Sequence, residues 1–212
     1  NYIEGLFLSS GIKISPNHTM EQIYETLRML RDEYDFNGYI HCKIIPGTDP
    51  VLIEAIGWYA DRLSCNLELP TAESLKKLAP HKNRKNILKP MRQIQLRRDR
   101  HNEYLGIDDT GRNLNLLTDG KNNIVGIGKP DNGYSSDIII PNGNTLPAKK
   151  RFAPAGQSTQ LIIGATEESD YQIMTVSEAL YKNFGLKRVF YSAFVNVNQD
   201  ESLPSTIDGP PL

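Results

Sequence analysis

The chain has 212 residues, 39% of them hydrophobic and 23% charged, with a formal net charge of −1, which suits one large domain or a domain carrying an insertion. No apolar run is long enough to span a membrane, and two cysteines in 212 residues exclude a disulfide-stapled secreted scaffold. Both cysteines, Cys42 and Cys65, fall in apolar stretches, as small buried residues of a reducing compartment do, so we expect a cytoplasmic protein.

Strands and helices are expected to alternate along the chain. Apolar runs bounded by turn residues predict five strands, over 2–8, 39–45, 63–69, 157–163 and 188–197. Apolar residues at helical spacing predict helices over 20–34, 50–59, 72–79, 83–98 with a kink at Pro90, and 170–184. Strands that alternate with helices in this way are typical of a parallel sheet.

Local signals mark several helix ends. Thr19 and Ser169 each stand three residues before a glutamine, which is the capping-box pattern, so we expect helices to begin at both positions. Asp49 followed by Pro50 predicts another helix start, with proline at the first helical position. Gly185 is expected to end the helix over 170–184.

Residues 99–150 have a different composition from the rest. Asn, Asp and Gly crowd together there, and short apolar runs such as 124–127 and 138–140 separate them. This pattern predicts an insertion of short hairpins or a mobile loop. We therefore expect one domain built from 1–98 and 151–198, an insertion over 99–150, and a polar, proline-rich tail over 199–212.

The stretch 151–168 is the one around which the chain is organised. It predicts a strand, a break at Gly164 and an acidic loop before the helix over 170–184, which together form a βα unit with its loop at the carboxyl end of the strand. Ser158 and Gln160 share one face of that strand. A polar row in a strand that should be buried on both sides indicates a site, and an edge strand with one wet face is the alternative.

Three predicted strands carry one apolar and one polar row. The polar rows consist of Tyr39, His41 and Lys43; of Ser64, Asn66 and Glu68; and of Ser158 and Gln160. A doubly wound sheet should be apolar on both faces, whereas a barrel with outer helices can hold a wet lumen. We therefore predict an α/β fold that is a TIM-like (β/α) barrel or part of one, with Tyr39, Lys43, Asn66 and Ser158 among the lumen residues.

With the strands in place, five stretches resemble one known family. They are GLFLSSGI (5–12), FNGYIHCKIIPG (36–47), DRLSCNLELPTAESLKKLAP (61–80), FAPAGQSTQLIIGATEESDYQI (152–173) and KRVFYSAFVNV (187–197). Their combination resembles the radical SAM superfamily, and most closely its members associated with DNA modification or repair. The resemblance implies a full or partial TIM-like barrel, S-adenosylmethionine and a [4Fe–4S] cluster as cofactors, and a nucleic-acid-related substrate.

The resemblance also implies roles for single residues in binding S-adenosylmethionine. Ser9, Ser10 and Gly11 stand where the family has a Gly-Gly-Glu loop against the methionyl amino group, and Glu68 stands where a residue contacts the ribose. The family's G-x-I-x-G-x-x-E pattern beside the adenine and methionine corresponds to Gln160, Ile162, Gly164 and Glu167, with glutamine in place of the first glycine. The backbone around Tyr191 and Ser192 would border the adenine.

The family's three-cysteine cluster motif has no counterpart in this sequence. A [4Fe–4S] cluster needs about three protein thiolates, and two separate cysteines cannot supply them. The chain begins where the second barrel strand should begin. We therefore expect the first strand and the cluster loop to precede Asn1 in a longer protein, and this piece alone to bind no metal and to be inactive.

The residues taken without the family leave alternatives open. Glu68 at a strand end suits ligand binding, or it caps the helix over 72–79. Glu167 binds a ligand, or it complements the positive end of the following helix. Lys43 beside His41 suggests a second function, a barrel aldolase or lyase with Lys43 as the Schiff-base nucleophile, while a satisfied buried pair is the structural alternative.

A basic run extends from Lys76 to Arg100, with ten Lys and Arg against the single acid Asp99. In a chain of net charge −1 this asymmetry indicates a nucleic-acid surface, or else a solvated helix face. The candidate phosphate contacts are Lys82, Arg84, Lys85 and Lys89.

Overall fold

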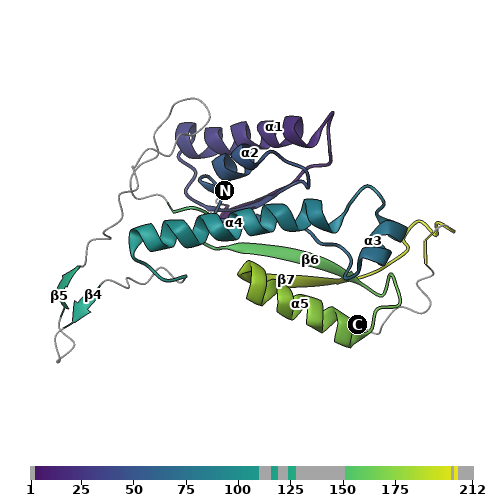
Figure 1. Ribbon diagram of the computed structural model, residues 1–212. Coiled ribbons are helices and arrows are strands. Elements are labelled where there is room, and N and C mark those ends of the chain that lie inside the picture. The colour runs from purple at the N-terminus through teal and green to yellow at the C-terminus, as the bar shows by residue number, and fades with distance from the viewer. Residues whose placement is uncertain (1–2, 110–115, 119–123, 128–150, 202, 205–212) are drawn as a thin grey trace.

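The computed structural model describes residues 3–109, 116–118, 124–127, 151–201 and 203–204 (Figure 1). The elements in chain order are β1 (Gly5–Leu8), α1 (Pro16–Arg28), the π-helical turn η1 (Met29–Glu33), β2 (Tyr39–Lys43), α2 (Pro50–Gly57), β3 (Arg62–Ser64), α3 (Ala72–Leu78), α4 (Arg84–Leu105), β4 (Leu116–Thr118), β5 (Ile124–Ile127), β6 (Gln157–Ile163), α5 (Asp170–Phe184) and β7 (Leu186–Ala193).

Five strands form a single sheet in which every neighbouring pair is parallel. Their order, β1-β2-β3-β6-β7, follows the order of these strands in the sequence. The carboxyl ends of all five strands therefore lie at one edge of the sheet. The predicted α/β fold with a parallel sheet is confirmed.

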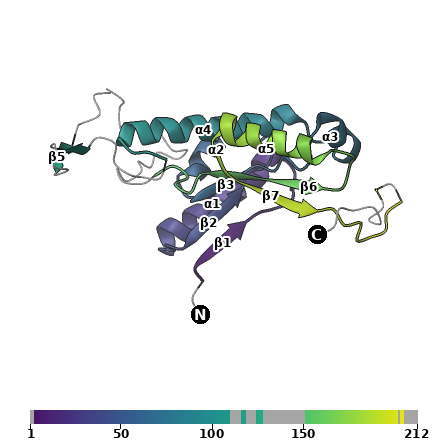
Figure 2. The same ribbon diagram turned by 90° about the horizontal axis from the view of Figure 1, so that it is seen from below.

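The described helices form one continuous layer. α1 packs on α2, α2 on α4, and α4 on α5, in the same sequence as the strands that they connect. α4 also packs on β6, and α5 on β7, and Figure 2 shows α4 and α5 on the same side of these two strands. The layer covers one face of the sheet. Successive strand side chains point to opposite faces, so every second strand residue points away from the helices.

Side chains that point into the helix layer form the apolar core. Ile40, Cys42, Leu63 and Leu161 are each 0% exposed and pack against apolar residues of the helices. We call the opposite side of the sheet the open face. Its residues, identified by the pairing of the strands, are Phe7, Tyr39, His41, Lys43, Arg62, Ser64, Ser158, Gln160, Ile162, Arg188, Phe190 and Ser192.

Most helix ends lie where the local signals predict them. Asp49 caps α2 by accepting a hydrogen bond from the Val51 N–H, Ser169 forms the predicted capping box of α5, and Gly185 ends α5 with φ of 57°. The predicted start at Thr19 is wrong, because α1 begins at Pro16. Ser15 supplies the cap, while the Thr19 hydroxyl donates back to carbonyl groups and is buried.

Several further elements differ from their predicted bounds. The strand predicted over 39–45 ends at Lys43, the helix predicted over 50–59 ends at Gly57, and the strand predicted over 188–197 is Leu186–Ala193. α4 continues to Leu105, where Gly106 closes it in a left-handed conformation, so the segment 99–105 is helical instead of part of a hairpin or mobile loop. The strand predicted over 63–69 is regular only as β3, Arg62–Ser64. Beyond Ser64 the chain rejoins the sheet through a single bridge between Glu68 and Leu161.

Part of the predicted insertion is a hairpin. β5, which is one of the apolar runs singled out in the sequence, pairs antiparallel with β4. The rest of 110–150, including the run over 138–140, and most of the tail over 199–212 lie outside the described residues. In the part of the chain that is described, no helix has the length and apolar character that crossing a membrane requires.

Candidate functional site

A row of polar side chains crosses the middle of the open face. Lys43 pairs in register with Ser64, Ser64 with Ser158, and Ser158 with Arg188. The two small hydroxyl residues are 4% and 0% exposed, and they lie between two strand positions with long cationic side chains. The Ser158 hydroxyl is buried without a hydrogen-bond partner, which is uncommon for a buried polar group.

His41 lies on the same face, one row nearer the start of the strands. It is in register with Phe7 and Arg62, and its ring meets the Phe7 ring edge to face at 4.7 Å. Burial, and then the charges of Arg62 and Lys43, lower the pKa of His41 to about 4, so it is neutral at physiological pH. Its Nε2 is buried without a hydrogen-bond partner.

Hydrogen-bonded polar side chains lie nearer the carboxyl ends of the strands. Asn66 donates to the Gln160 side-chain oxygen at 3.3 Å, and Gln160 donates in turn to the Ser192 hydroxyl at 2.6 Å. The three residues come from the segment after β3, from β6 and from β7. The structure therefore brings together Asn66, Gln160 and Ser192, which were predicted as site residues from separate parts of the sequence.

Glu68 occupies the edge itself and has an unusual backbone. Its φ is 67°, a left-handed conformation that a residue with a side chain adopts at a cost of roughly 1–2 kcal/mol. Its N–H donates to the Gln160 carbonyl and its own carbonyl accepts from Ile162, at 2.9 and 2.6 Å. Glu68 pairs with Leu161, which points into the helix layer, and not with a residue of the open face. The predicted polar row of Ser64, Asn66 and Glu68 therefore ends at Asn66.

The remaining predicted cofactor residues also lie near this edge. Ser9, Ser10 and Gly11 follow β1 directly and are exposed. Gly164 ends β6 with φ of 83°, and Ile162 pairs with Ser192. The Tyr191 side chain points to the helix layer, where its hydroxyl donates to Ser177, so only its backbone can border a ligand on the open face.

Two adjacent glutamates after β6 differ sharply in their surroundings. Glu167, singled out in the sequence, is exposed, with no hydrogen bond or ion pair among the described residues. Glu168 accepts hydrogen bonds from the hydroxyls of Thr71, Ser74 and Thr166. Burial opposes its ionisation, but these hydrogen bonds outweigh burial and hold the pKa of Glu168 below its usual range. Glu168 thus joins the start of α3 to the loop before α5.

The two cysteines are unsuited to bind metal. Cys42 and Cys65 are 0% and 1% exposed and belong to separate core clusters. Burial raises the pKa of both thiols to about 12, so neither forms a thiolate at physiological pH. Within the described ranges no group of three or more His, Cys, Asp or Glu residues could hold a metal ion.

In the folded chain, several cations of the basic run are paired with carboxylates or buried. Lys82 pairs with Glu68 at 2.8 Å and Arg97 pairs with Glu54 at 2.8 Å, while Arg98 is buried and donates to the Ala153 carbonyl. Arg84, Lys85 and Lys89 remain exposed on the first turns of α4. Three of the four predicted nucleic-acid contacts are therefore available, while Lys82 is engaged with the site edge.

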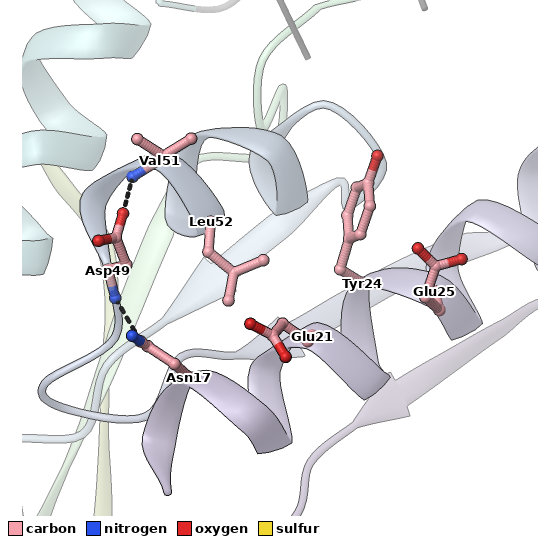
Figure 3. Close-up of a pocket in the computed structure, with 7 residues that line it drawn as sticks. All are labelled: Asn17, Glu21, Tyr24, Glu25, Asp49, Val51 and Leu52. Carbon is pink, nitrogen blue, oxygen red and sulfur yellow. Dashed lines mark hydrogen bonds between the residues drawn. The ribbon is translucent and has the colours of Figure 1, made fainter. Parts of the chain in front are cut away.

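The pockets described in the protein lie away from the open face. The larger, of about 370 Å³, lies between α1 and α2, and Figure 3 shows the Leu52 and Glu21 side chains pointing toward each other across it. A second, of about 300 Å³, lies between α3 and α5. The predicted lumen residues Tyr39, Lys43, Ser158 and Gln160 share the open face but line neither of these pockets.

Sequence reasoning did not single out four open-face residues. Phe7, Arg62, Arg188 and Phe190 lie beside the predicted row because of strand register. The alternation Arg188, Phe190, Ser192 in the last strand is visible in the sequence. Only the pairing with β6 shows that this row continues the row of Ser158 and Gln160.

Comparison of the chain with protein-family models, with curated proteins and with solved structures finds no match in any of the three.

Proposed function

We propose that the chain forms the S-adenosylmethionine-binding part of a radical enzyme that acts on nucleic acid. The observation that carries the proposal is Glu68, a carboxylate held in a left-handed backbone conformation at the carboxyl-end edge of a parallel sheet. Strained residues of this kind concentrate at binding sites, and α/β folds bind their ligands at this edge.

The proposal includes a barrel-like sheet whose inner surface is the open face. Strands that follow one another in sequence order, with their helices in one layer, support this geometry. In a doubly wound fold the strand order would reverse and helices would lie on both faces. The polar row of the open face then corresponds to the wet lumen expected from the sequence.

The residues at the edge fit the nucleoside part of S-adenosylmethionine. A carboxylate such as Glu68 can accept hydrogen bonds from both ribose hydroxyls, and the amides of Asn66 and Gln160 offer donors and acceptors to an adenine ring. Gly164 has no side chain to block the approach of a ligand to the end of β6. When bound, S-adenosylmethionine supplies an activated sulfonium, and this chain's residues would orient its nucleoside and exclude water.

The described residues do not fit a [4Fe–4S] cluster. Two buried thiols in different core clusters cannot replace three clustered thiolates. We therefore expect anaerobic reconstitution of this chain with iron and sulfide to produce no iron–sulfur absorbance. Stoichiometric cluster binding would contradict this expectation.

Calorimetry with 5′-methylthioadenosine tests the nucleoside site without any cluster. We expect binding by the parent chain and a loss of at least about tenfold in affinity for Glu68→Gln, which removes one charged acceptor. Glu73→Gln, an exposed carboxylate on α3, is the matched control and should bind like the parent. Absence of binding by the parent, or equal binding by Glu68→Gln, would overturn the proposal.

A second candidate function, an aldolase or lyase, is favoured by the state of Lys43. Its amine is half-buried and has no ion pair or hydrogen bond among the described residues, and the neutral His41 lies two residues away on the same face. An unpaired lysine in such surroundings can form a Schiff base with a carbonyl substrate. Borohydride trapping of a small aldehyde on Lys43, lost in Lys43→Arg, would support it, and labelling spread over exposed lysines would reject it.

A further inference from the structure

The open face combines exposed aromatic rings with positive charge. Phe7, Tyr39 and Phe190 are 58%, 42% and 42% exposed, which is unusual for rings on a sheet. Lys43, Arg62 and Arg188 lie among them. No acidic residue is among the described strand residues of this face, so its charge is not neutralised locally.

The cations are placed close to the rings. The Arg62 side chain donates to the Tyr39 hydroxyl at 2.7 Å, and the Arg188 guanidinium lies 5.5 Å from the centre of the Phe190 ring. Arg62 also has a buried nitrogen without a hydrogen-bond partner. Arg62 thus lies at the hydroxyl edge of the Tyr39 ring and Arg188 lies over one face of the Phe190 ring. Each of these two rings therefore has a guanidinium close enough to meet the phosphate of a base stacked on the ring.

We infer that the open face binds single-stranded nucleic acid, with bases stacked on Phe7, Tyr39 and Phe190 and phosphates near Lys43, Arg62 and Arg188. Stacking on aromatic side chains within a positive surface is how proteins hold unpaired strands, because every base offers a π-face. A duplex keeps its bases stacked on each other and cannot use the rings. β1 and β7 are four strand spacings apart, roughly 19 Å, enough for several nucleotides.

This inference deepens the nucleic-acid part of the proposed function, but it does not depend on nucleoside binding at Glu68. The two ideas fail in different experiments, since the nucleic-acid measurement contains no S-adenosylmethionine. It also concerns a surface other than the exposed cations of α4, which lie on the helix layer.

Fluorescence anisotropy with a labelled oligothymidylate of about 12 nucleotides tests the inference on the 212-residue chain. We expect Phe190→Ala to weaken binding roughly 5- to 100-fold, and Phe190→Tyr to restore it, because tyrosine keeps the stacking surface. We expect Arg188→Ala to weaken binding and to reduce the log–log salt slope by about 0.7. Tyr171→Ala and Lys182→Ala on α5 are the matched controls, being exposed residues of the helix layer, and should bind like the parent.

Several results would overturn the inference. They are the absence of binding at low salt, equal affinity of Phe190→Ala and Tyr171→Ala, and tighter binding of a duplex than of the single strand. Loss of binding only when Arg84, Lys85 and Lys89 are reversed would assign the contact to α4 instead. Self-association of the chain that Phe190→Ala abolishes, without nucleic-acid binding, would make the open face a contact between copies. Unfolding midpoints of each variant identify any loss that comes from misfolding.

Discussion

Lys82 donates a hydrogen bond to the carboxylate of Glu68 at 2.8 Å, and this ion pair joins the loop before α4 to the carboxyl-end edge of the sheet. Glu68 is 17% exposed in its side chain and Lys82 is 35% exposed, so the pair is partly shielded from solvent. The Glu68 backbone nevertheless stays in the left-handed region. The ion pair and the two main-chain hydrogen bonds to β6 hold the carboxylate in one position.

Replacing Glu68 by glycine should separate stability from ligand binding. Glycine relieves the left-handed strain, roughly 1 kcal/mol, and this gain offsets the lost ion pair, which contributes up to about 1 kcal/mol. We expect an unchanged or slightly raised urea midpoint together with loss of 5′-methylthioadenosine binding. Asp35→Gly is the control, since Asp35 also has positive φ and is exposed, and it should leave binding intact. A large destabilisation by Glu68→Gly would show that the carboxylate mainly supports the fold.

The hydroxyls of Ser158 and Thr159 should differ in their effect on stability. Thr159 accepts from the Leu67 N–H and donates to the Cys65 carbonyl, at 2.9 and 2.8 Å, so Thr159→Val leaves buried main-chain groups unpaired. We expect a loss of about 1–3 kcal/mol in the free energy of unfolding for Thr159→Val. Ser158→Ala removes a hydroxyl that has no partner and should change stability by less than about 0.5 kcal/mol. Equal losses in urea denaturation would contradict this assignment of hydrogen bonds.

Glu168, and not its neighbour Glu167, should matter for stability. Glu168→Ala removes the carboxylate that accepts from the hydroxyls of Thr71 and Ser74, and we expect a loss of about 1–3 kcal/mol in the free energy of unfolding. Since the folded-state pKa of Glu168 is lowered, its contribution is present above its unfolded pKa and is lost as the pH falls through the folded value. Glu167→Ala should leave the free energy of unfolding nearly unchanged. Thermal unfolding of both variants from pH 3 to pH 7 measures the difference.

His41 should make the protein less stable in mild acid. The folded-state pKa of about 4 lies below the ordinary value of 6.5, so the unfolded chain binds the proton first as the pH falls. Stability should therefore decline between about pH 6.5 and pH 4, by about 1–2 kcal/mol after allowance for the partial exposure of the ring. His41→Gln should flatten this part of the pH profile of the urea midpoint. An unchanged slope would show that other groups cause it.

The exposed cations of α4 should contribute little to nucleic-acid affinity if the open face is the main surface. Reversing Arg84, Lys85 and Lys89 to glutamate should then lower affinity for a single strand only modestly, through long-range electrostatics that vanish in high salt. Lys82 is left unchanged, because its loss would also release Glu68. A salt series by anisotropy gives the comparison, and a loss larger than that of Arg188→Ala would favour the helix over the sheet.

The sequence by itself was enough for those features that depend on neighbouring residues. The strand over 157–163 has the predicted bounds, and the capping box at Ser169, the proline-initiated start of α2 after Asp49 and the glycine stop at Gly185 lie at the predicted positions. Each depends on contacts within about one helical turn or on the two-residue period of a strand, so a local pattern suffices to predict it. The predicted start of α1 was wrong because both Ser15 and Thr19 are residue types that cap helices. In the structure Ser15 is the cap, and Thr19 is buried inside the helix.

Only the tertiary structure decided which polar rows lie together and which charges are available. A period of two shows that Ser158 and Gln160 share a face, but the pairing with β7 adds Arg188 and Phe190 to it. Likewise, the sequence shows Lys82 only as one cation of a basic run, whereas the fold places it against a carboxylate fourteen residues earlier. Strand register and ion pairing depend on how distant segments pack, and no pattern within a short window contains that information.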